Sequence, residues 1–140
     1  MLYIQYVLLR WEVVPLKILI SSQSELPIYA QIKEQIKEQI LNGTLVEGDV
    51  LPSIRQLAKE AGVGVITITR AYNDLEGEGF IASMQGKGSI VLSRDNNMIK
   101  EQYLKRIEEG LEIAIENADY MKMPDDELIS VLKNLLQQRS

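Results

Sequence analysis

Residues 52–91 read PSIRQLAKEAGVGVITITRAYNDLEGEGFIASMQGKGSIV and divide into helical and extended segments. Ser53 followed three residues later by Gln56 is a capping-box pattern, which starts a helix. That helix is short, because Gly62 supplies a stop that tolerates the left-handed conformation. The apolar spacing predicts a second helix over about residues 65–78.

Two short apolar runs, residues 80–83 and 89–92, follow the second helix and flank a glycine-rich loop. Strands on either side of such a loop are typical of a β-hairpin, and Gly86 and Gly88 allow the tip to approach a surface closely. In isolation these glycines fit a plain surface turn equally well. After two helices joined by a glycine turn, they favour the wing of a helix-turn-helix, whose second helix can lie in the major groove of DNA.

Upstream of this region, Pro27 suits the first position of a helix. An apolar stripe with a four-residue period predicts that helix, and Asn42-Gly43 ends it. The stripe consists of Ile28, Ile32, Ile36 and Ile40.

The first twenty residues are apolar but are interrupted by Arg10, Glu12 and Lys17, among others. They contain neither a run long enough to span a membrane nor the pattern of a signal peptide. Leu16–Ile20 is predicted to be a strand or an arm. Residues 1–14 match no element that we can assign, and an upstream start codon or a cloning artefact would explain them.

Downstream, a polar linker at residues 94–97 precedes two amphipathic helices, one to about Met121 and one beginning near Pro124. Together they form too small a core for a ligand-binding domain. Their apolar faces must therefore be buried against the first domain or against another chain.

The predicted fold is mainly α with a small β-hairpin. We expect an N-terminal arm over residues 1–24, a winged helix-turn-helix domain over residues 25–93 and a two-helix dimerisation extension over residues 94–140.

Composition limits the possible functions. The chain has no cysteine and no histidine, which excludes disulfides, thiolate or imidazole metal sites and Cys-His or Ser-His nucleophiles. We therefore expect no metal and no cofactor, and a reducing cytoplasm as the compartment. The net charge of −5 is unusual for a nucleic-acid-binding protein, and residues 26–92 share this acidity. It lowers non-specific affinity for DNA and makes a second, dimeric half more necessary.

The motifs resemble those of the GntR superfamily of bacterial transcription regulators over about residues 27–91. The matching pieces are Pro27-Ile28-Tyr29-x-Gln31-Ile32, Gly48-x-x-Leu51-Pro52-Ser53-x-Arg55-x-Leu57-Ala58, Arg70-Ala71-Tyr72-x-x-Leu75-Glu76-x-Glu78-Gly79 and the glycine-tipped hairpin. The short helical tail is similar to that of the YtrA-type branch, which has a dimerising extension in place of a large effector domain.

The resemblance implies that an arginine, the start and exposed face of the second helix, and the tip of the wing all contact DNA. The matching residues are Arg55, Gly64, Val65, Ile66, Thr67, Thr69, Arg70, Gly86, Lys87 and Gly88. Polar or basic residues are common in the family where this chain has Gly64-Val65-Ile66. Valine and isoleucine remain able to contact a thymine methyl group.

Several of these residues also have a purely structural interpretation. Arg55 could pair with Glu60 or Glu76, and Arg70 could be a cation on the opposite face of its helix. We expect Tyr72 to be a core residue. Tyr29 is predicted to pack rather than to contact phosphate.

Taken together, the sequence predicts a sequence-specific DNA-binding regulator, a repressor, that binds an inverted-repeat operator in double-stranded DNA as a homodimer. Residues of the tail that would form the dimer are Ile99, Tyr103, Ile107, Leu111, Leu132 and Leu136. The alternative is a winged-helix protein-interaction module without DNA binding. No set of acid, base and nucleophile indicates an enzyme. No membrane partner is expected, and whether a small-molecule effector exists is left open.

Overall fold

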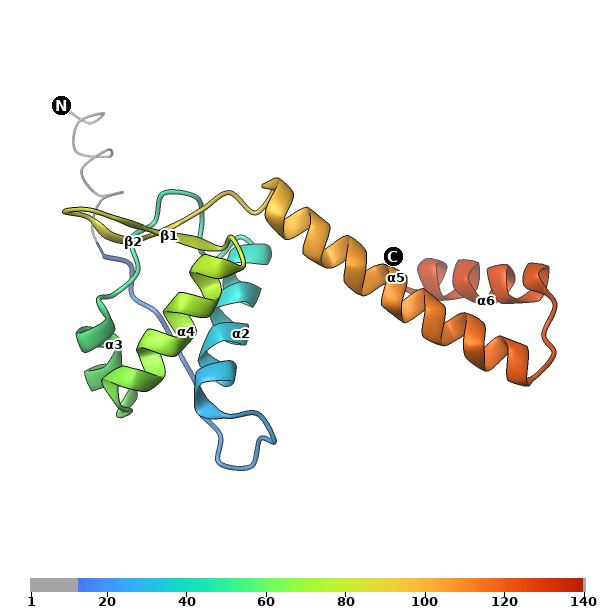
Figure 1. Cartoon of the computed structure of the whole chain (residues 1–140), viewed down its shortest axis with the longest axis horizontal. Coiled ribbons are helices and arrows are strands. Elements are labelled where there is room, and N and C mark those ends of the chain that lie inside the picture. The colour runs from blue at the N-terminus through green and yellow to red at the C-terminus, as the bar shows by residue number, and fades with distance from the viewer. Residues whose placement is uncertain (1–12, 140) are drawn as a thin grey trace. The chain divides into compact units, whose positions relative to one another are not determined.

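The computed structural model describes residues 13–139, which fall into two units, the first ending at Ile99 and the second beginning at Lys100 (Figure 1). The first unit contains α2 (Ile28–Leu41), α3 (Ile54–Ala61), α4 (Val65–Gly77), β1 (Ile81–Met84) and β2 (Gly88–Val91). α5 (Asn97–Tyr120) and α6 (Asp125–Gln138) follow. The predicted fold class, mainly helical with one two-stranded hairpin, is confirmed.

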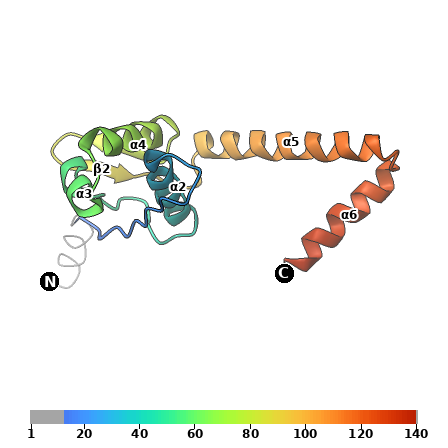
Figure 2. The same ribbon diagram turned by 90° about the horizontal axis from the view of Figure 1, so that it is seen from below.

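The core of the first unit lies where α2 and α4 pack side by side (Figures 1 and 2). Three members of the predicted stripe, Ile32, Ile36 and Ile40, are at most 1% exposed. Ile68 and Leu75 meet them from α4 and are fully buried. The four-residue period thus marks the buried face of α2, although Ile28 at its start is exposed.

Two local signals position α3 as predicted. The Ser53 hydroxyl oxygen accepts a hydrogen bond from the Gln56 backbone N–H at 3.1 Å, and Gly62 ends the helix at φ +68°. The reciprocal half of the capping box is replaced by another contact, because the Gln56 side-chain amide donates to Glu60 Oε1 at 3.1 Å.

The hairpin forms where it is predicted, with each strand one residue nearer the loop than expected. Ile81 pairs with Val91 and Met84 pairs with Gly88, so the loop is residues 85–87. The Lys87 N–H donates to the Met84 carbonyl at 2.9 Å, and Gly86 stands at φ +80°. A turn of this kind needs a positive φ at its third position, which glycine adopts without strain.

The described part of the arm is extended chain with a single bridge, Val13 to Val50, and not a regular strand. Its backbone is held by side-chain amides of α2. Gln35 accepts from the Leu19 N–H at 2.8 Å and donates to the Leu19 carbonyl at 2.6 Å. Gln31 makes the same pair of bonds to Ser21, at 2.9 and 3.0 Å. The earlier part of the predicted arm, residues 1–12, lies outside the described residues.

The first turn of α5 belongs to the first unit. The Asn96 side chain accepts from the Ile99 N–H at 3.1 Å and donates to the Gly79 carbonyl at 2.9 Å. Ile99 is only 2% exposed, and a Cβ added to Gly79 would lie 2.8 Å from the sulfur of Met98. The first unit therefore continues past the predicted boundary at residue 93.

In the second unit, α5 ends in a tight turn before α6. The Met123 N–H donates to the Ala118 carbonyl at 2.9 Å, and the Lys122 N–H donates to the Asp119 carbonyl at 3.0 Å. Lys122 takes the left-handed conformation, φ +53°, that glycine usually provides in this motif. Within residues 13–139, no helix is both long and apolar enough to cross a membrane.

Candidate nucleic-acid interface

α3, the start of α4 and the tip of the hairpin lie on the same side of the first unit, the left-hand side in Figures 1 and 2. These three elements carry all the residues that the resemblance assigns to DNA contact. Eight of them are exposed and two, both threonines, are half-buried. The exposed residues are Arg55, Gly64, Val65, Ile66, Arg70, Gly86, Lys87 and Gly88, and the half-buried ones are Thr67 and Thr69.

Arg55 is exposed in the first turn of α3. The two carboxylates considered as its partners are engaged elsewhere. Glu60 accepts from the Gln56 side chain, and Glu76 accepts from the Ser83 N–H at 2.8 Å. Within residues 13–139, no carboxylate forms an ion pair with Arg55. Its guanidinium is therefore available to an external anion.

Arg70 stacks on an aromatic ring. Its guanidinium carbon lies 3.7 Å from the centre of the Tyr29 ring, which projects from the first turn of α2. The contact occupies one face of the planar cation and leaves its in-plane N–H groups for acceptors. Tyr29 is half-buried, as predicted for a packing residue.

Tyr72 is a core residue, which confirms the prediction. It is 3% exposed, and its hydroxyl donates to the Pro52 carbonyl at 2.6 Å. Burial, and then the negative charge of Glu60, raise the pKa of Tyr72 well above its usual range. The neutral hydroxyl thus ties α4 to the residue that precedes the cap of α3, and this bond helps to set the position of one helix against the other.

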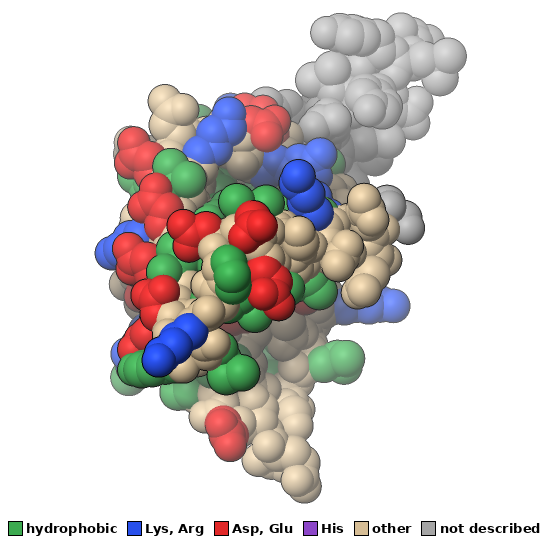
Figure 3. Space-filling model, turned by 90° about the vertical axis from the view of Figure 1, so that its right-hand side faces the viewer, with side chains coloured by type: hydrophobic (Ala, Val, Ile, Leu, Met, Phe, Trp, Pro, Cys, Tyr) green, Lys and Arg blue, Asp and Glu red, His purple; other side chains and the backbone are tan. Residues whose placement is uncertain are grey.

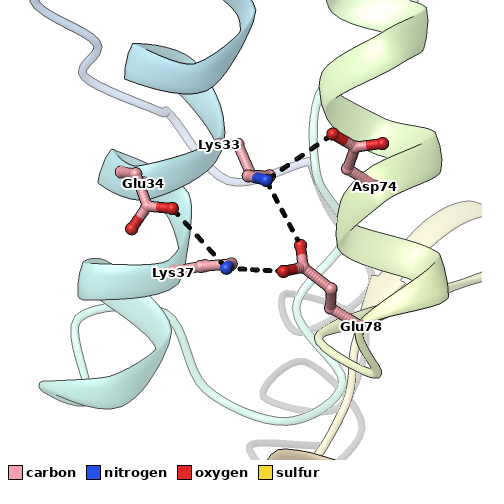
Figure 4. Close-up of polar contacts among 5 residues, drawn as sticks. All are labelled: Lys33, Glu34, Lys37, Asp74 and Glu78. Carbon is pink, nitrogen blue, oxygen red and sulfur yellow. Dashed lines mark hydrogen bonds and ion pairs between the residues drawn. The ribbon is translucent and has the colours of Figure 1, made fainter. Parts of the chain in front are cut away.

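The acidity of the first unit is partly neutralised by an ion-pair cluster between α2 and the second half of α4 (Figure 4). Lys33 Nζ lies 3.6 Å from Asp74 and 3.7 Å from Glu78. Lys37 Nζ lies 2.8 Å from Glu78 and 3.5 Å from Glu34. We call these five residues the α2–α4 ion-pair cluster.

Lys37 is the buried member of this cluster. It is 6% exposed, and its ammonium lies 5.4 Å from the centre of the Phe80 ring. Asp74 lies in the last turn of α4 and Glu78 is its C-cap residue, so both are away from the helix start at Val65. The carboxylates of α4 that face α2 are therefore paired at the end of the helix farther from the proposed contact residues.

The second unit exposes a broad apolar face. Most residues predicted to form the dimer are among its exposed side chains: Ile107, Leu111, Leu132 and Leu136 are 43–57% exposed. Tyr103 is half-buried, and the guanidinium of Arg106 lies 5.1 Å from its ring centre. Ile99 departs from the prediction, because its side chain is already buried in the first unit.

A groove of about 260 Å³ runs between the two tail helices. Its lining is aliphatic throughout and consists of Leu111, Ala114, Ile115, Leu128, Ile129, Val131, Leu132 and Leu135. Figure 3, which faces the α5–α6 end of the chain, shows hydrophobic side chains interspersed with acidic ones. The tail surface thus combines apolar area with negative charge.

Among the described residues, no group of three or more His, Cys, Asp or Glu side chains is arranged to hold a metal ion. Sequence reasoning missed three sets of contacts: the glutamine bonds to the arm, the Arg70–Tyr29 stack and the α2–α4 ion-pair cluster. The four-residue spacings of Lys33 with Lys37 and of Asp74 with Glu78 were a usable signal, since residues with this spacing lie on the same side of a helix or of the helix and its cap.

Comparison with known proteins agrees with this geometry. The model described as "Bacterial regulatory proteins, gntR family" matches residues 28–91. The HTH-type transcriptional repressor YtrA of Bacillus subtilis (strain 168) is 34% identical over 116 residues, 83% of this chain and 89% of that protein.

The chain is also similar to proteins of known structure. YtrA from Sulfolobus acidocaldarius, a GntR-family transcription factor, is 42% identical with a TM-score of 0.52, over 64% of this chain and 95% of that one. A transcriptional antiterminator from Listeria monocytogenes EGD-e is 30% identical with a TM-score of 0.63, over 88% of this chain and 92% of that one.

Proposed function

This chain belongs to the gntR family of bacterial regulatory proteins, to its YtrA type, and we propose that it represses transcription by binding an inverted-repeat operator as a homodimer. Like these relatives, it is a DNA-binding transcriptional regulator and not an enzyme. The repressor function is proposed because the Bacillus relative is a transcriptional repressor.

One observation supports the DNA-binding surface above all others. α3, the start of α4 and the hairpin tip present their exposed residues on one side of the first unit. In this proposal α4 enters the major groove at Gly64, with Val65, Ile66, Thr67 and Thr69 toward the base edges.

The positively charged side chains around this helix contact the DNA phosphates in this proposal. Arg55 lies on α3, Arg70 stacks on Tyr29, and Lys87 is at the tip of the wing between Gly86 and Gly88. Phosphate contacts fix the register of the protein on the duplex without reading sequence. Few such cations are present, so one protomer alone binds weakly and a dimer is needed.

The tail supplies the dimer in this proposal. Its aliphatic side chains on the proposed dimer surface stay 43–57% exposed in the described part of the second unit, and a two-fold axis would allow this surface to pack against its own copy. The proposed surface comprises Tyr103, Ile107, Leu111, Leu132 and Leu136 and leaves out Ile99. Two recognition helices would then face half-sites about 34 Å apart on cytoplasmic DNA.

A mobility-shift titration of the full chain with the DNA upstream of its own gene tests this function. We expect a retarded species that contains two protomers and that resists competition by random DNA. Footprinting should show two protected half-sites related by a dyad. A chain that binds operator and random DNA equally would contradict sequence-specific regulation and favour a protein-interaction module.

A further inference from the structure

The exposed face at the start of α4 has an unusual chemistry for a helix that reads base edges. Ile66 is 85% exposed and Val65 is 47% exposed, so neither side chain is needed to fill the core. Gly64 precedes them as the cap and brings no side chain. Outward methyl groups therefore form the leading edge of the helix.

Hydrogen-bonding readout is scarce on the same face. Residues 64–69 contain no Arg, Lys, Asn or Gln, the side chains that make paired bonds to guanine or adenine. The hydroxyl of Thr69 donates to the Val65 carbonyl at 2.8 Å within the helix. Its hydrogen is thus committed, and the residue offers a base an acceptor oxygen and a methyl group.

The nearest charged and amide side chains of α4 do not replace this edge. Arg70 is held against the Tyr29 ring. Asn73 is seven residues beyond Ile66, which is about 10 Å along the helix axis and about three base steps away. Val65 and Ile66 can therefore discriminate between bases through apolar contact alone.

Because thymine alone presents a methyl group in the major groove, we infer that Ile66, supported by Val65, is a specificity-determining residue that reads thymine 5-methyl groups in each half-site. The inference rests on the proposed function, since it assigns what α4 recognises in the operator. In this inference the exposed methyl groups of Ile66 and Val65 contact a methyl group on the DNA and not the hydrogen-bonding groups of a base.

Uracil substitution tests this inference, because uracil is thymine without the methyl group. An operator is first selected from random duplexes with the full-length chain, and each thymine is then replaced singly by uracil. Loss of one buried methyl should weaken binding about fourfold at one or two positions in a half-site. The salt dependence of binding should stay unchanged, because no phosphate contact is lost.

A second substitution separates the methyl group from the rest of the base pair. At a sensitive position, the T·A pair is replaced by C·G or by 5-methylcytosine·G. The methylated pair should bind about fourfold better than the unmethylated one, since the methyl group occupies the same place in the groove. Equal binding of the two pairs would overturn the inference.

The protein side is tested with Ile66→Ala, which should fold normally because the side chain is exposed. This variant should bind thymine and uracil operators equally. Leu19→Ala is the matched control, since Leu19 is an aliphatic residue 82% exposed on the arm, and it should keep the full preference for thymine. Uracil sensitivity that persists in Ile66→Ala would assign methyl recognition elsewhere and overturn the inference.

Different results would contradict the methyl readout and the proposed regulator function. A wild-type protein that selects an operator yet tolerates uracil at every thymine would overturn the methyl readout and leave the regulator function standing. A protein that selects no operator would overturn both.

Discussion

Arg55 is exposed on α3, and the carboxylates considered as its partners are engaged elsewhere. We expect Arg55→Ala to weaken operator binding by about 1–3 kcal/mol, because a charge-assisted contact to DNA is lost. Fluorescence anisotropy at fixed salt gives the affinity, and circular dichroism checks the fold. Arg55→Lys is the matched variant and should retain part of the affinity. Unchanged binding by the alanine variant would remove Arg55 from the interface.

Lys87 belongs to the tip of the wing, between two glycines with positive φ. A phosphate contact carries no sequence information, so Lys87→Ala should reduce the affinity for operator and random DNA by similar factors. The slope of log affinity against log salt should fall in magnitude by about 1. Titrations at several salt concentrations measure this slope. If only operator binding declines, the wing reads bases and the phosphate assignment is wrong.

Two carboxylates in the α2–α4 ion-pair cluster, those of Glu78 and Glu34, bind Lys37, and we expect them to contribute unequally to stability. Glu78 is the closer one at 2.8 Å and is 29% exposed, whereas Glu34 lies at 3.5 Å and is 48% exposed. Glu78→Gln leaves the ammonium of Lys37 buried with a weaker partner and should lower the unfolding free energy by about 1–3 kcal/mol. Glu34→Gln should cost less than about 0.5 kcal/mol.

Urea denaturation of both variants measures these costs. Each change removes one negative charge beside Lys37 and keeps the shape of the side chain, and Glu78→Gln also weakens the ion pair with Lys33 at 3.7 Å. Equal costs for the two variants would show that burial does not control the strength of this cluster.

The elements differ in how well the sequence predicts them. The Ser53 cap and the stop at Gly62 are local, so the bounds of α3 could be predicted from a few neighbouring residues. The partners of Arg70 and Lys37 lie 41 residues away along the chain, on another helix or at its cap. No local pattern encodes such pairings, because they depend on how α2 and α4 are placed against one another.

Ile99 shows the same limit at the boundary between the units. Helical spacing places it on the apolar stripe of α5, and the sequence therefore assigns it to the dimer surface. The structure buries it in the first unit, because Asn96 caps the helix while bonding to Gly79. The period of a stripe identifies an apolar face but does not say what covers each part of it.

At the scale of the whole molecule, this boundary determines where the chain can be divided. A chain that ends at Lys100 keeps Asn96 and Ile99 and should be a folded monomer. A chain that ends at Asp95 loses both, and its unfolding free energy should be lower by about 2 kcal/mol, the value of burying one large aliphatic side chain. Thermal unfolding followed by circular dichroism compares the two.

Both shortened chains should lose the dimer, since the exposed aliphatic face of the tail is removed. Sedimentation measures the oligomeric state. Operator affinity should fall by a factor of about 10²–10⁴, because two linked half-sites no longer benefit from effective concentration. A stable dimer of the chain that ends at Lys100 would move the interface to the arm or to α2.

The amides of Gln31 and Gln35 contact the arm through its backbone and not through its side chains. Every residue except proline carries the same N–H and carbonyl, so positions 19 and 21 can change their side chains without losing these bonds, whereas Leu16 of the same arm is buried. In a saturation mutagenesis screen, positions 19 and 21 should accept most residues and reject proline, which lacks the donor. The two glutamines should tolerate few replacements, so conservation would fall on Gln31 and Gln35 and not on the two arm positions that they hold.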